Sequence, residues 1–162
     1  MRVSLREVAF TCGCCGERYR DGLLVGGYGR LVVRDADGRS AACADLLDDP
    51  LVDLLAQVSA ERSGLFARVG VEPADVPGAY LRLCDPSPSG AAWDRGALPC
   101  CPACGAQPSQ QERLDGLLQV DLPELRHDAL DALPRDEQRA RASAALRPAS
   151  VNDPPGPAPP RG

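Results

Sequence analysis

The sequence contains no lysine, no isoleucine and a single histidine, His127. Without lysine the chain cannot form the phosphate-binding loop that ends in Gly-Lys-Ser or Gly-Lys-Thr, so nucleotide-binding proteins of that class are excluded. A single histidine also excludes most catalytic schemes in which a histidine base activates a serine or cysteine nucleophile. His127 lies off the apolar face that Leu122, Leu125 and Ala129 would share, so we expect an exposed helix residue.

Long apolar runs and clusters of positive charge are also missing. No stretch approaches the roughly 18 consecutive apolar residues of a membrane helix. Residues 1–10 include Arg2, Arg6 and Glu7, where a signal peptide would have an apolar run. The formal net charge is −5 and the arginines are scattered, which disfavours nucleic acid as a partner. We therefore expect a cytoplasmic protein without a membrane segment.

Cysteine, by contrast, is abundant, with eight among the 162 residues. In a reducing compartment this indicates metal or redox chemistry before disulfides. Two short turns share the pattern Cys-x-x-Cys-Gly: the first turn is Cys12-Gly13-Cys14-Cys15-Gly16 and the second is Cys101-Pro102-Ala103-Cys104-Gly105. Cysteines at this spacing can reach one ion, and the glycine permits a bend that directs amide hydrogens at sulfur.

These two turns resemble the knuckles of zinc-ribbon and rubredoxin-like proteins, in which facing Cys-x-x-Cys-Gly turns each lie at the tip of a β-hairpin. The resemblance covers only about 25 residues around the two turns. It implies one structural Zn²⁺ ion held by Cys12, Cys15, Cys101 and Cys104. Four thiolates leave no open coordination position, so such an ion would not act as a Lewis acid.

Two alternatives at this site stay open. Cys14 or Cys100, each next to a predicted ligand, can replace its neighbour. Iron can replace zinc, although rubredoxins surround iron with aromatic residues and this chain has only two Phe, three Tyr and one Trp.

The segments around the turns predict an α+β fold. Val3–Phe10 is the expected strand into the first turn, and residues 117–122 form the expected strand after the second. Between the turns we expect an antiparallel β-meander over residues 23–43, including a hairpin turn at residues 35–38. A helix is predicted from Pro50 to about Arg62 with Asp49 as its N-cap. Its apolar residues repeat at helical spacing: Leu51, Leu54, Leu55 and Val58.

The rest of the chain gives weaker patterns. Residues 63–69 predict a short helix, residues 73–77 an irregular loop between Pro73 and Pro77, and residues 79–84 a strand. Residues 122–133 and 135–146 have helical periodicity. Six of the last sixteen residues are proline, so residues 147–162 are predicted to be a disordered tail.

The domain interpretation is a single zinc-binding domain over residues 1–146, with knuckles at residues 12–16 and 101–105 and a subdomain inserted at residues 17–99. This separation far exceeds the roughly 15–20 residues of a compact four-cysteine finger. Because the entropy of closing a loop rises only logarithmically with its length, the separation argues little against a shared ion.

The functional prediction is a non-enzymatic zinc protein that binds another protein, with no small-molecule substrate identified. An acidic cluster at residues 45–53 is interpreted as a solvated helix terminus and not as a catalytic carboxylate pair. The alternative functions are a redox- or metal-responsive thiol protein and a zinc-ribbon protein that binds nucleic acid.

Overall fold

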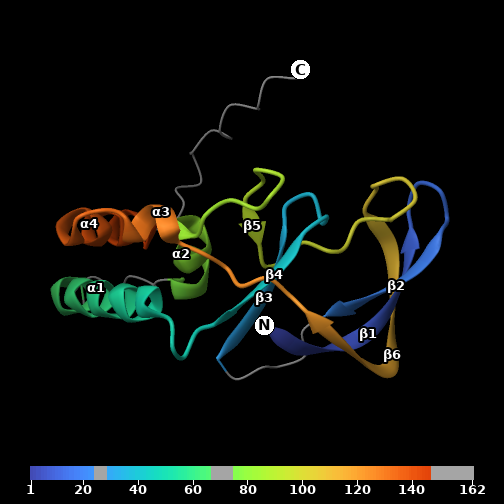
Figure 1. Cartoon of the computed structure of the whole chain (residues 1–162), viewed down its shortest axis with the longest axis horizontal. Helices are drawn as coiled ribbons and strands as arrows, with labels where there is room; N and C mark the ends of the chain where they lie inside the picture. The colour runs from blue at the N-terminus through green and yellow to red at the C-terminus, as the bar shows by residue number, and fades with distance from the viewer. Residues whose placement is uncertain (24–28, 67–74, 147–162) are drawn as a thin grey trace, which may run out of the picture.

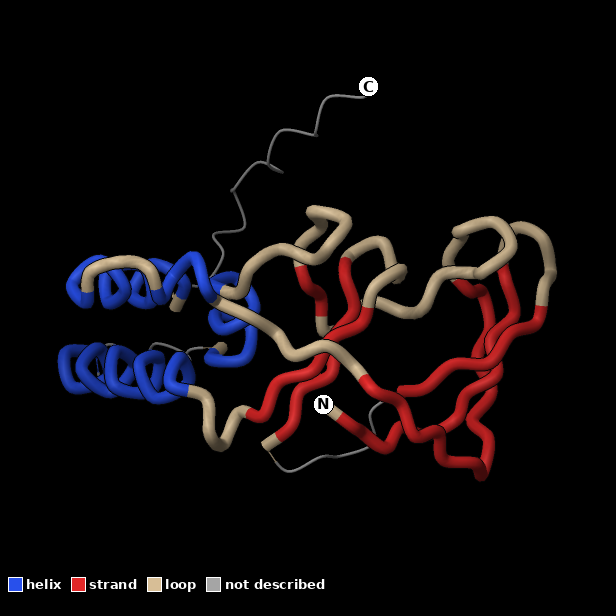
Figure 2. Tube along the Cα trace, viewed as in Figure 1, coloured by secondary structure: helices blue, strands red, loops and turns tan. Residues whose placement is uncertain are grey.

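The computed structural model describes residues 1–23, 29–66 and 75–146, without the side chains of residues 62–66. Within these ranges the chain forms two three-stranded antiparallel sheets and four helices, a mixed α+β fold as predicted. The helices lie together at one end of the molecule, one sheet lies at the other end, and the second sheet lies between them (Figures 1 and 2). The elements are β1 (Arg2–Cys12), β2 (Arg18–Leu23), β3 (Arg30–Asp35), β4 (Ala41–Asp45), α1 (Pro50–Phe66), α2 (Val76–Leu83), β5 (Trp93–Asp94), β6 (Pro108–Asp121), α3 (Asp128–Asp131) and α4 (Arg135–Ala145).

The first sheet has the strand order β2-β1-β6 and is built on the long strand β1. Burial along β1 alternates, but it skips one residue between Leu5 and Val8. The pairing of β1 with β6 has a register irregularity at the same point, between Arg6 and Val8. Between the pairs formed by Arg6 and Val8, β1 has one residue and β6 has three, so β6 carries the extra residues of the bulge. The apolar residues of both halves of β1 are nevertheless buried. These residues are Val3, Leu5, Val8 and Phe10.

The second sheet has the order β4-β3-β5, and the helices cover it. The β3–β4 pair confirms the predicted hairpin, and the N–H of Gly38 donates to the carbonyl oxygen of Asp35 at 2.8 Å in its turn. Helix α1 confirms the predicted helix and extends it to Phe66. Its predicted apolar face is buried and packs with Val33, Ala42, Ala44, Ala79, Tyr80, Leu125 and Leu130 in the main core.

The meander predicted over residues 23–43 is wrong in its first strand pairing, because β2 does not pair with β3. Strand β2 pairs with β1, whereas β3 pairs with β4 and β5 in the other sheet. The physical reason is the first cysteine turn, which is itself the turn of a β1–β2 hairpin: the N–H of Cys12 donates to the carbonyl oxygen of Glu17 at 2.9 Å. Residues 26–28, where a reversal was expected, lie outside the described residues.

The predicted strand over residues 79–84 is also wrong, because α2 occupies this segment. Asp75 caps the helix, and its side chain accepts a hydrogen bond from the N–H of Gly78 at 3.0 Å. Pro77 falls in the first turn, where a missing amide hydrogen costs nothing. Pro77 therefore begins a helix and does not bracket a loop. Of the short helix predicted at residues 63–69, residues 63–66 belong to α1 and the others lie outside the described residues.

Residues 122–133 contain only the short helix α3. Leu122–Leu125 are extended beside β4: the N–H of Cys43 donates to the carbonyl oxygen of Pro123 at 3.0 Å, and the N–H of Leu125 donates to that of Cys43 at 2.7 Å. These bonds to β4 replace the predicted helical ones. The helix predicted over residues 135–146 is confirmed as α4, and the predicted tail lies outside the described residues. Within the described ranges, no helix has the length and apolar character needed to cross a membrane.

Candidate metal centre

The first cysteine turn joins β1 to β2 in a tight bend. Besides the Cys12–Glu17 bond, the N–H of Gly16 donates to the carbonyl oxygen of Cys12 at 3.2 Å. Gly16 has a φ of +75°. A residue with a Cβ pays roughly 1–2 kcal/mol for this left-handed conformation, so glycine suits the position.

The second turn repeats this geometry, although it precedes β6 and follows a loop. The N–H of Cys101 donates to the carbonyl oxygen of Ala106 at 2.8 Å, and the N–H of Gly105 donates to that of Cys101 at 2.8 Å. Gly105 has a φ of +74°. The two turns are thus equivalent in backbone hydrogen bonding, and each one gathers its own pair of cysteines.

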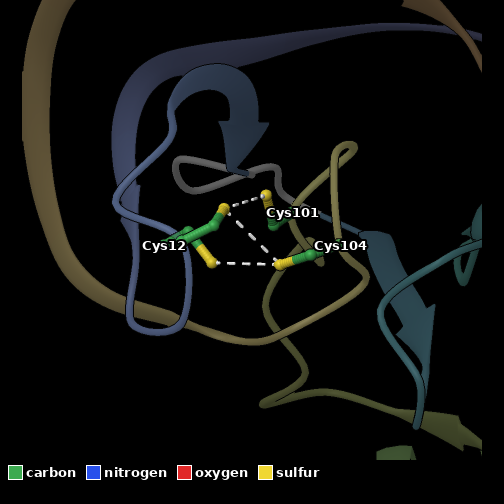
Figure 3. Close-up of side chains that lie close together, drawn as sticks. Cys12, Cys101 and Cys104 are labelled. Carbon is green, nitrogen blue, oxygen red and sulfur yellow. Dashed lines mark hydrogen bonds between the residues drawn. The ribbon is translucent and has the colours of Figure 1, made fainter.

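The fold brings the two turns face to face, with four sulfur atoms converging between them (Figure 3). The Sγ atoms of Cys12, Cys15, Cys101 and Cys104 all lie within 4.8 Å of one another. Three contacts cross between the turns: Cys12 to Cys104 at 3.5 Å, Cys15 to Cys104 at 3.6 Å and Cys15 to Cys101 at 3.7 Å. A tetrahedron with sulfur about 2.3 Å from a central ion has edges of about 3.8 Å. The four cysteines are therefore positioned to hold one metal ion.

The electrostatics of the cluster concentrate negative charge on one sulfur. Hydrogen bonds from the backbone amides of Cys15 and Cys14 lower the pKa of the Cys12 thiol to about 6, and the Cys14 amide lies 3.3 Å from the Cys12 Sγ. The amide of Ala106 lowers the pKa of Cys104, but the neighbouring sulfurs of Cys12 and Cys15 outweigh it and raise that pKa to about 12. Further thiolates are disfavoured until a cation arrives, and a metal ion would release protons as it binds.

An aromatic pair lies directly behind the first turn. Phe10 and Tyr19 stack with their ring centroids 5.5 Å apart, and Phe10 is fully buried. The hydroxyl of Tyr19 donates to the carbonyl oxygen of Pro99 at 2.7 Å. Burial, and then the charge of Cys101 and Cys12, raise the pKa of Tyr19 to about 12. Tyr19 therefore links β2 to the segment before the second turn, a role that no sequence pattern indicated.

The β3–β4 turn supports the second cysteine turn from the other side. The N–H of Cys100 donates to the carbonyl oxygen of Gly38 at 3.0 Å. A Cβ on Gly38 would collide with the carbonyl oxygen of Leu98 and lie 2.9 Å from the Cys100 nitrogen. The sequence indicated a turn at Gly38, but the contact with a segment 60 residues away has no sequence signal.

The other four cysteines are outside the cluster. Cys14 and Cys100, the alternative ligands, lie beside it, and Cys14 is exposed. Cys43 and Cys84 lie elsewhere in the fold. Burial raises the pKa of both thiols, that of Cys84 to about 12.

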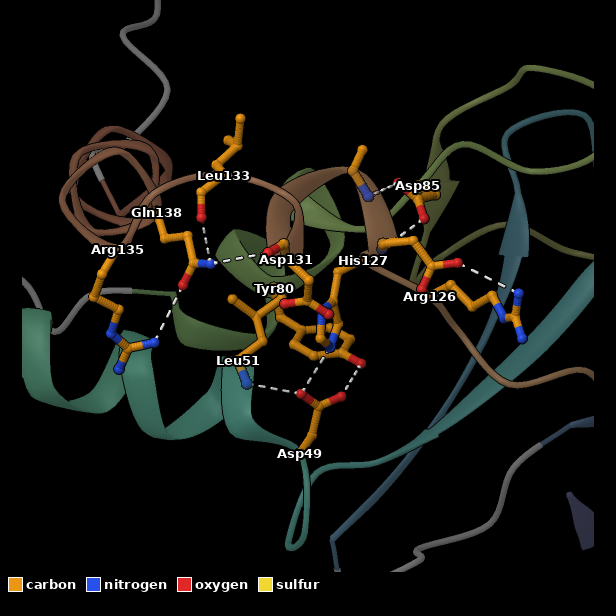
Figure 4. A network of polar contacts seen from close by, with 12 residues as sticks. Asp49, Leu51, Tyr80, Asp85, Arg126, His127, Asp131, Leu133, Arg135 and Gln138 are labelled. Carbon is orange, nitrogen blue, oxygen red and sulfur yellow. Dashed lines mark hydrogen bonds and ion pairs between the residues drawn. The ribbon is translucent and has the colours of Figure 1, made fainter.

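A second polar cluster surrounds His127, and it corrects the prediction of an exposed helix residue (Figure 4). The His127 side chain is only 13% exposed, with Nε2 3.1 Å from an oxygen of Asp49 and Nδ1 2.9 Å from one of Asp131. The Tyr80 hydroxyl donates to Asp49 at 2.6 Å. His127 is the N-cap residue of α3 and does not lie on a helix face, so the start of α1 can pack against it.

This cluster borders a cavity of about 250 Å³ whose wall includes Asp45, Asp48, Asp49, Glu124, His127 and Asp128. Asp49 caps α1 as predicted, because its side chain accepts a hydrogen bond from the N–H of Leu51 at 2.8 Å. Asp49 joins Tyr80 of α2 to His127 at the start of α3. The Nδ1 atom of His127 is buried near Asp131 but has no hydrogen-bond partner among the described residues. These contacts form a clamp between α1, α2 and α3.

Comparison with protein-family models, curated proteins and solved structures found no match to this chain. The candidate site is therefore judged on its own geometry. The strongest feature is the set of four cysteines from two equivalent turns.

Proposed function

We propose that this chain is a non-enzymatic zinc protein of zinc-ribbon type, in which Cys12, Cys15, Cys101 and Cys104 hold one structural Zn²⁺ ion. The observation that carries the proposal is the convergence of four sulfur atoms within 4.8 Å from two equivalent turns. An ion there would tie the β1–β2 hairpin to the start of β6. It would stabilise the fold because it binds the folded chain and not the unfolded one.

Zinc is preferred over iron, although a tetrahedral set of four sulfurs suits both metals. A rubredoxin-like iron site is surrounded by several aromatic side chains. In the described part of this chain, Phe10 and Tyr19 form the one stacked aromatic pair, and the whole sequence has six aromatic residues. An iron site of this type would also colour the protein, which makes the choice easy to test.

We propose another protein as the partner. Four thiolates would complete the coordination of the ion, so no position is left to activate a substrate. The net charge of −5 repels phosphate backbones, which disfavours DNA and RNA. A mobility shift with DNA or RNA at low salt would replace this proposal with the nucleic-acid alternative.

Metal analysis and native mass spectrometry of the purified chain test the site. We expect one zinc per chain and no visible colour. Serine at any one of the four predicted ligands should reduce bound zinc to well below one per chain and lower the melting temperature. Cys14→Ser is the matched control, since Cys14 lies in the same turn but outside the cluster. A parent chain that folds without metal, or zinc loss in the control equal to that in the ligand variants, would contradict the proposal.

A further inference from the structure

The two cysteines of each turn differ in exposure. Cys12 and Cys101, the first cysteine of each turn, are buried, with 3% and 1% of their surface accessible. Cys15 and Cys104, the second cysteine of each turn, are exposed. The four-sulfur cluster therefore has an inner half that solvent does not reach and an outer half that it does.

The outer half is a pair and not two separate thiols. The Sγ atoms of Cys15 and Cys104 lie 3.6 Å apart, in contact across the two turns. A disulfide needs about 2.05 Å between the sulfurs, so a modest approach of the turns would join them. A bound zinc ion would hold both sulfurs as thiolates. Exposure and proximity are then the remaining conditions for an oxidant to convert the pair to a disulfide.

We propose that Cys15 and Cys104 form an oxidation site through which peroxide regulates metal retention. This inference rests on the proposed zinc site and adds its regulation. One exposed thiolate attacks hydrogen peroxide: an S–O bond forms, the O–O bond breaks and hydroxide leaves, giving a sulfenic acid. The other thiolate then attacks that sulfur: the S–S bond forms, the S–O bond breaks and a second hydroxide leaves. Two electrons pass from the thiolates to peroxide.

Oxidation replaces one link between the turns with another. The disulfide removes two of the four ligands, and the remaining pair, Cys12 and Cys101, is too few to retain zinc, so the ion leaves. The new bond still joins residues 15 and 104, which are far apart in sequence. The oxidised protein therefore keeps the two turns together without metal, and reduction by a dithiol restores the four-thiol site.

Among the cysteines outside the cluster, Cys43 and Cys84 are poor competitors for this role, whereas Cys14 is accessible. Cys43 is fully buried and its Sγ donates to the carbonyl oxygen of Pro123, and Cys84 is only partly exposed, so peroxide reaches both less readily than the exposed pair. Cys14 is exposed, but it contacts the cluster through its backbone amide and not through its sulfur. Cys14 is therefore the competitor that an experiment has to exclude.

The test treats the zinc-loaded full-length chain with hydrogen peroxide and follows zinc release with a chromogenic chelator. Peptide mapping after alkylation should find one new disulfide, Cys15–Cys104, in step with release of one zinc. The oxidised, metal-free protein should melt roughly 5–10 °C above the reduced protein stripped by chelator, because the disulfide restricts the unfolded chain. A disulfide between any other cysteines, or equal melting temperatures, would overturn the proposal.

Two histidine substitutions distinguish the role of the exposed cysteines from that of the buried ones. Both can retain the metal, since zinc also accepts three cysteines and one histidine as ligands. Loaded with zinc, Cys15→His lacks one outer thiol and should release zinc at least tenfold more slowly than the parent. Cys12→His keeps the outer pair and should still form the disulfide. Cys14→Ser should react at the parent rate. The proposal would be overturned if peroxide released zinc equally slowly from both histidine variants. It would also be overturned if Cys14→Ser released zinc more slowly than the parent.

Failure of this inference is distinguishable from failure of the proposed function. If the chain binds no zinc, the metal analysis of the untreated protein shows it and the proposed function fails. If the chain binds one zinc ion, but peroxide releases none or releases it without the Cys15–Cys104 disulfide, the proposed zinc site holds and the proposed regulation by peroxide is wrong.

Discussion

At the scale of single residues, Gly38 joins the turn between β3 and β4 to the segment that precedes the second cysteine turn. Its φ of +71° already favours glycine. Its α-carbon also lies directly against the backbone of Leu98 and Cys100, just before the second cysteine turn. A side chain at this position would therefore displace the loop backbone at residues 98–100, which leads directly into Cys101.

We predict that Gly38→Ala destabilises the protein and weakens zinc binding. The left-handed backbone costs alanine about 1–2 kcal/mol, and displacement of the 98–100 backbone adds about 1–3 kcal/mol. Gly90→Ala is the matched control, because Gly90 has a φ of +80° but a Cβ added there would have no atom within 4 Å. Denaturant unfolding and a competitive zinc titration measure both variants. Equal losses in the two variants would mean that the contact with the second turn is unimportant.

At the scale of elements, the helical end depends on the clamp around His127. One imidazole contacts Asp49 at the start of α1 and Asp131 in α3, and Asp49 also accepts a hydrogen bond from Tyr80 of α2. The carboxylate of Asp85 caps α3, accepting from the N–H of Asp128 at 2.8 Å. Helices of such different lengths are thus fixed to one another at their ends by polar contacts, in addition to the apolar core.

We predict that His127→Ala lowers the free energy of unfolding by about 1–3 kcal/mol, since the partly buried hydrogen bond to the Asp49 carboxylate is lost. Arg126→Ala is the control. Its ion pair with Asp128 is largely exposed, at 75% and 69% of the two side chains, and should contribute less than about 0.5–1 kcal/mol. Zinc content should be unchanged in both variants because the clamp is remote from the cysteine turns. A loss in Arg126→Ala as large as in His127→Ala would contradict the clamp.

At the scale of the whole molecule, the apolar core and the metal site are in different places. The main core joins the second sheet to the helices and contains none of the four clustered cysteines. A smaller cluster of Val3, Leu5, Cys43 and Leu122 joins the two sheets. The far end of the first sheet instead relies on Phe10, Tyr19 and the cysteine turns.

We predict that removing the metal loosens one end of the molecule before the other. Hydrogen exchange of the chelator-treated protein should rise first in residues 12–17 and 99–107, while α1 retains its protection because its buried face packs in the main core. Readdition of zinc should restore the original pattern. Exchange that rises uniformly along the chain would show instead that the metal supports the whole fold.

How far the sequence predicts this protein depends on the range of the interaction. The Cys-x-x-Cys-Gly turns were visible because the pattern is local: two cysteines and a glycine within five residues define a knuckle wherever it lies. Helix α1 was visible for a similar reason, since Asp49, Pro50 and the leucine spacing all act within a few turns. The prediction of a loop ending at Pro77 was wrong because a proline occurs both in loops and in the first turn of a helix, and the local sequence does not distinguish the two.

Other features were decided only by tertiary structure. The pairing of β2 with β1 depends on the first turn acting as a hairpin turn, and the burial of His127 depends on the start of α1 packing against the residue before α3. The sequence by itself determined that four cysteines stand in two equivalent turns. Only the tertiary structure decided that these turns face each other, which half of the cluster is exposed, and that Gly38 and Tyr19 support it, because those contacts join segments that are distant along the chain.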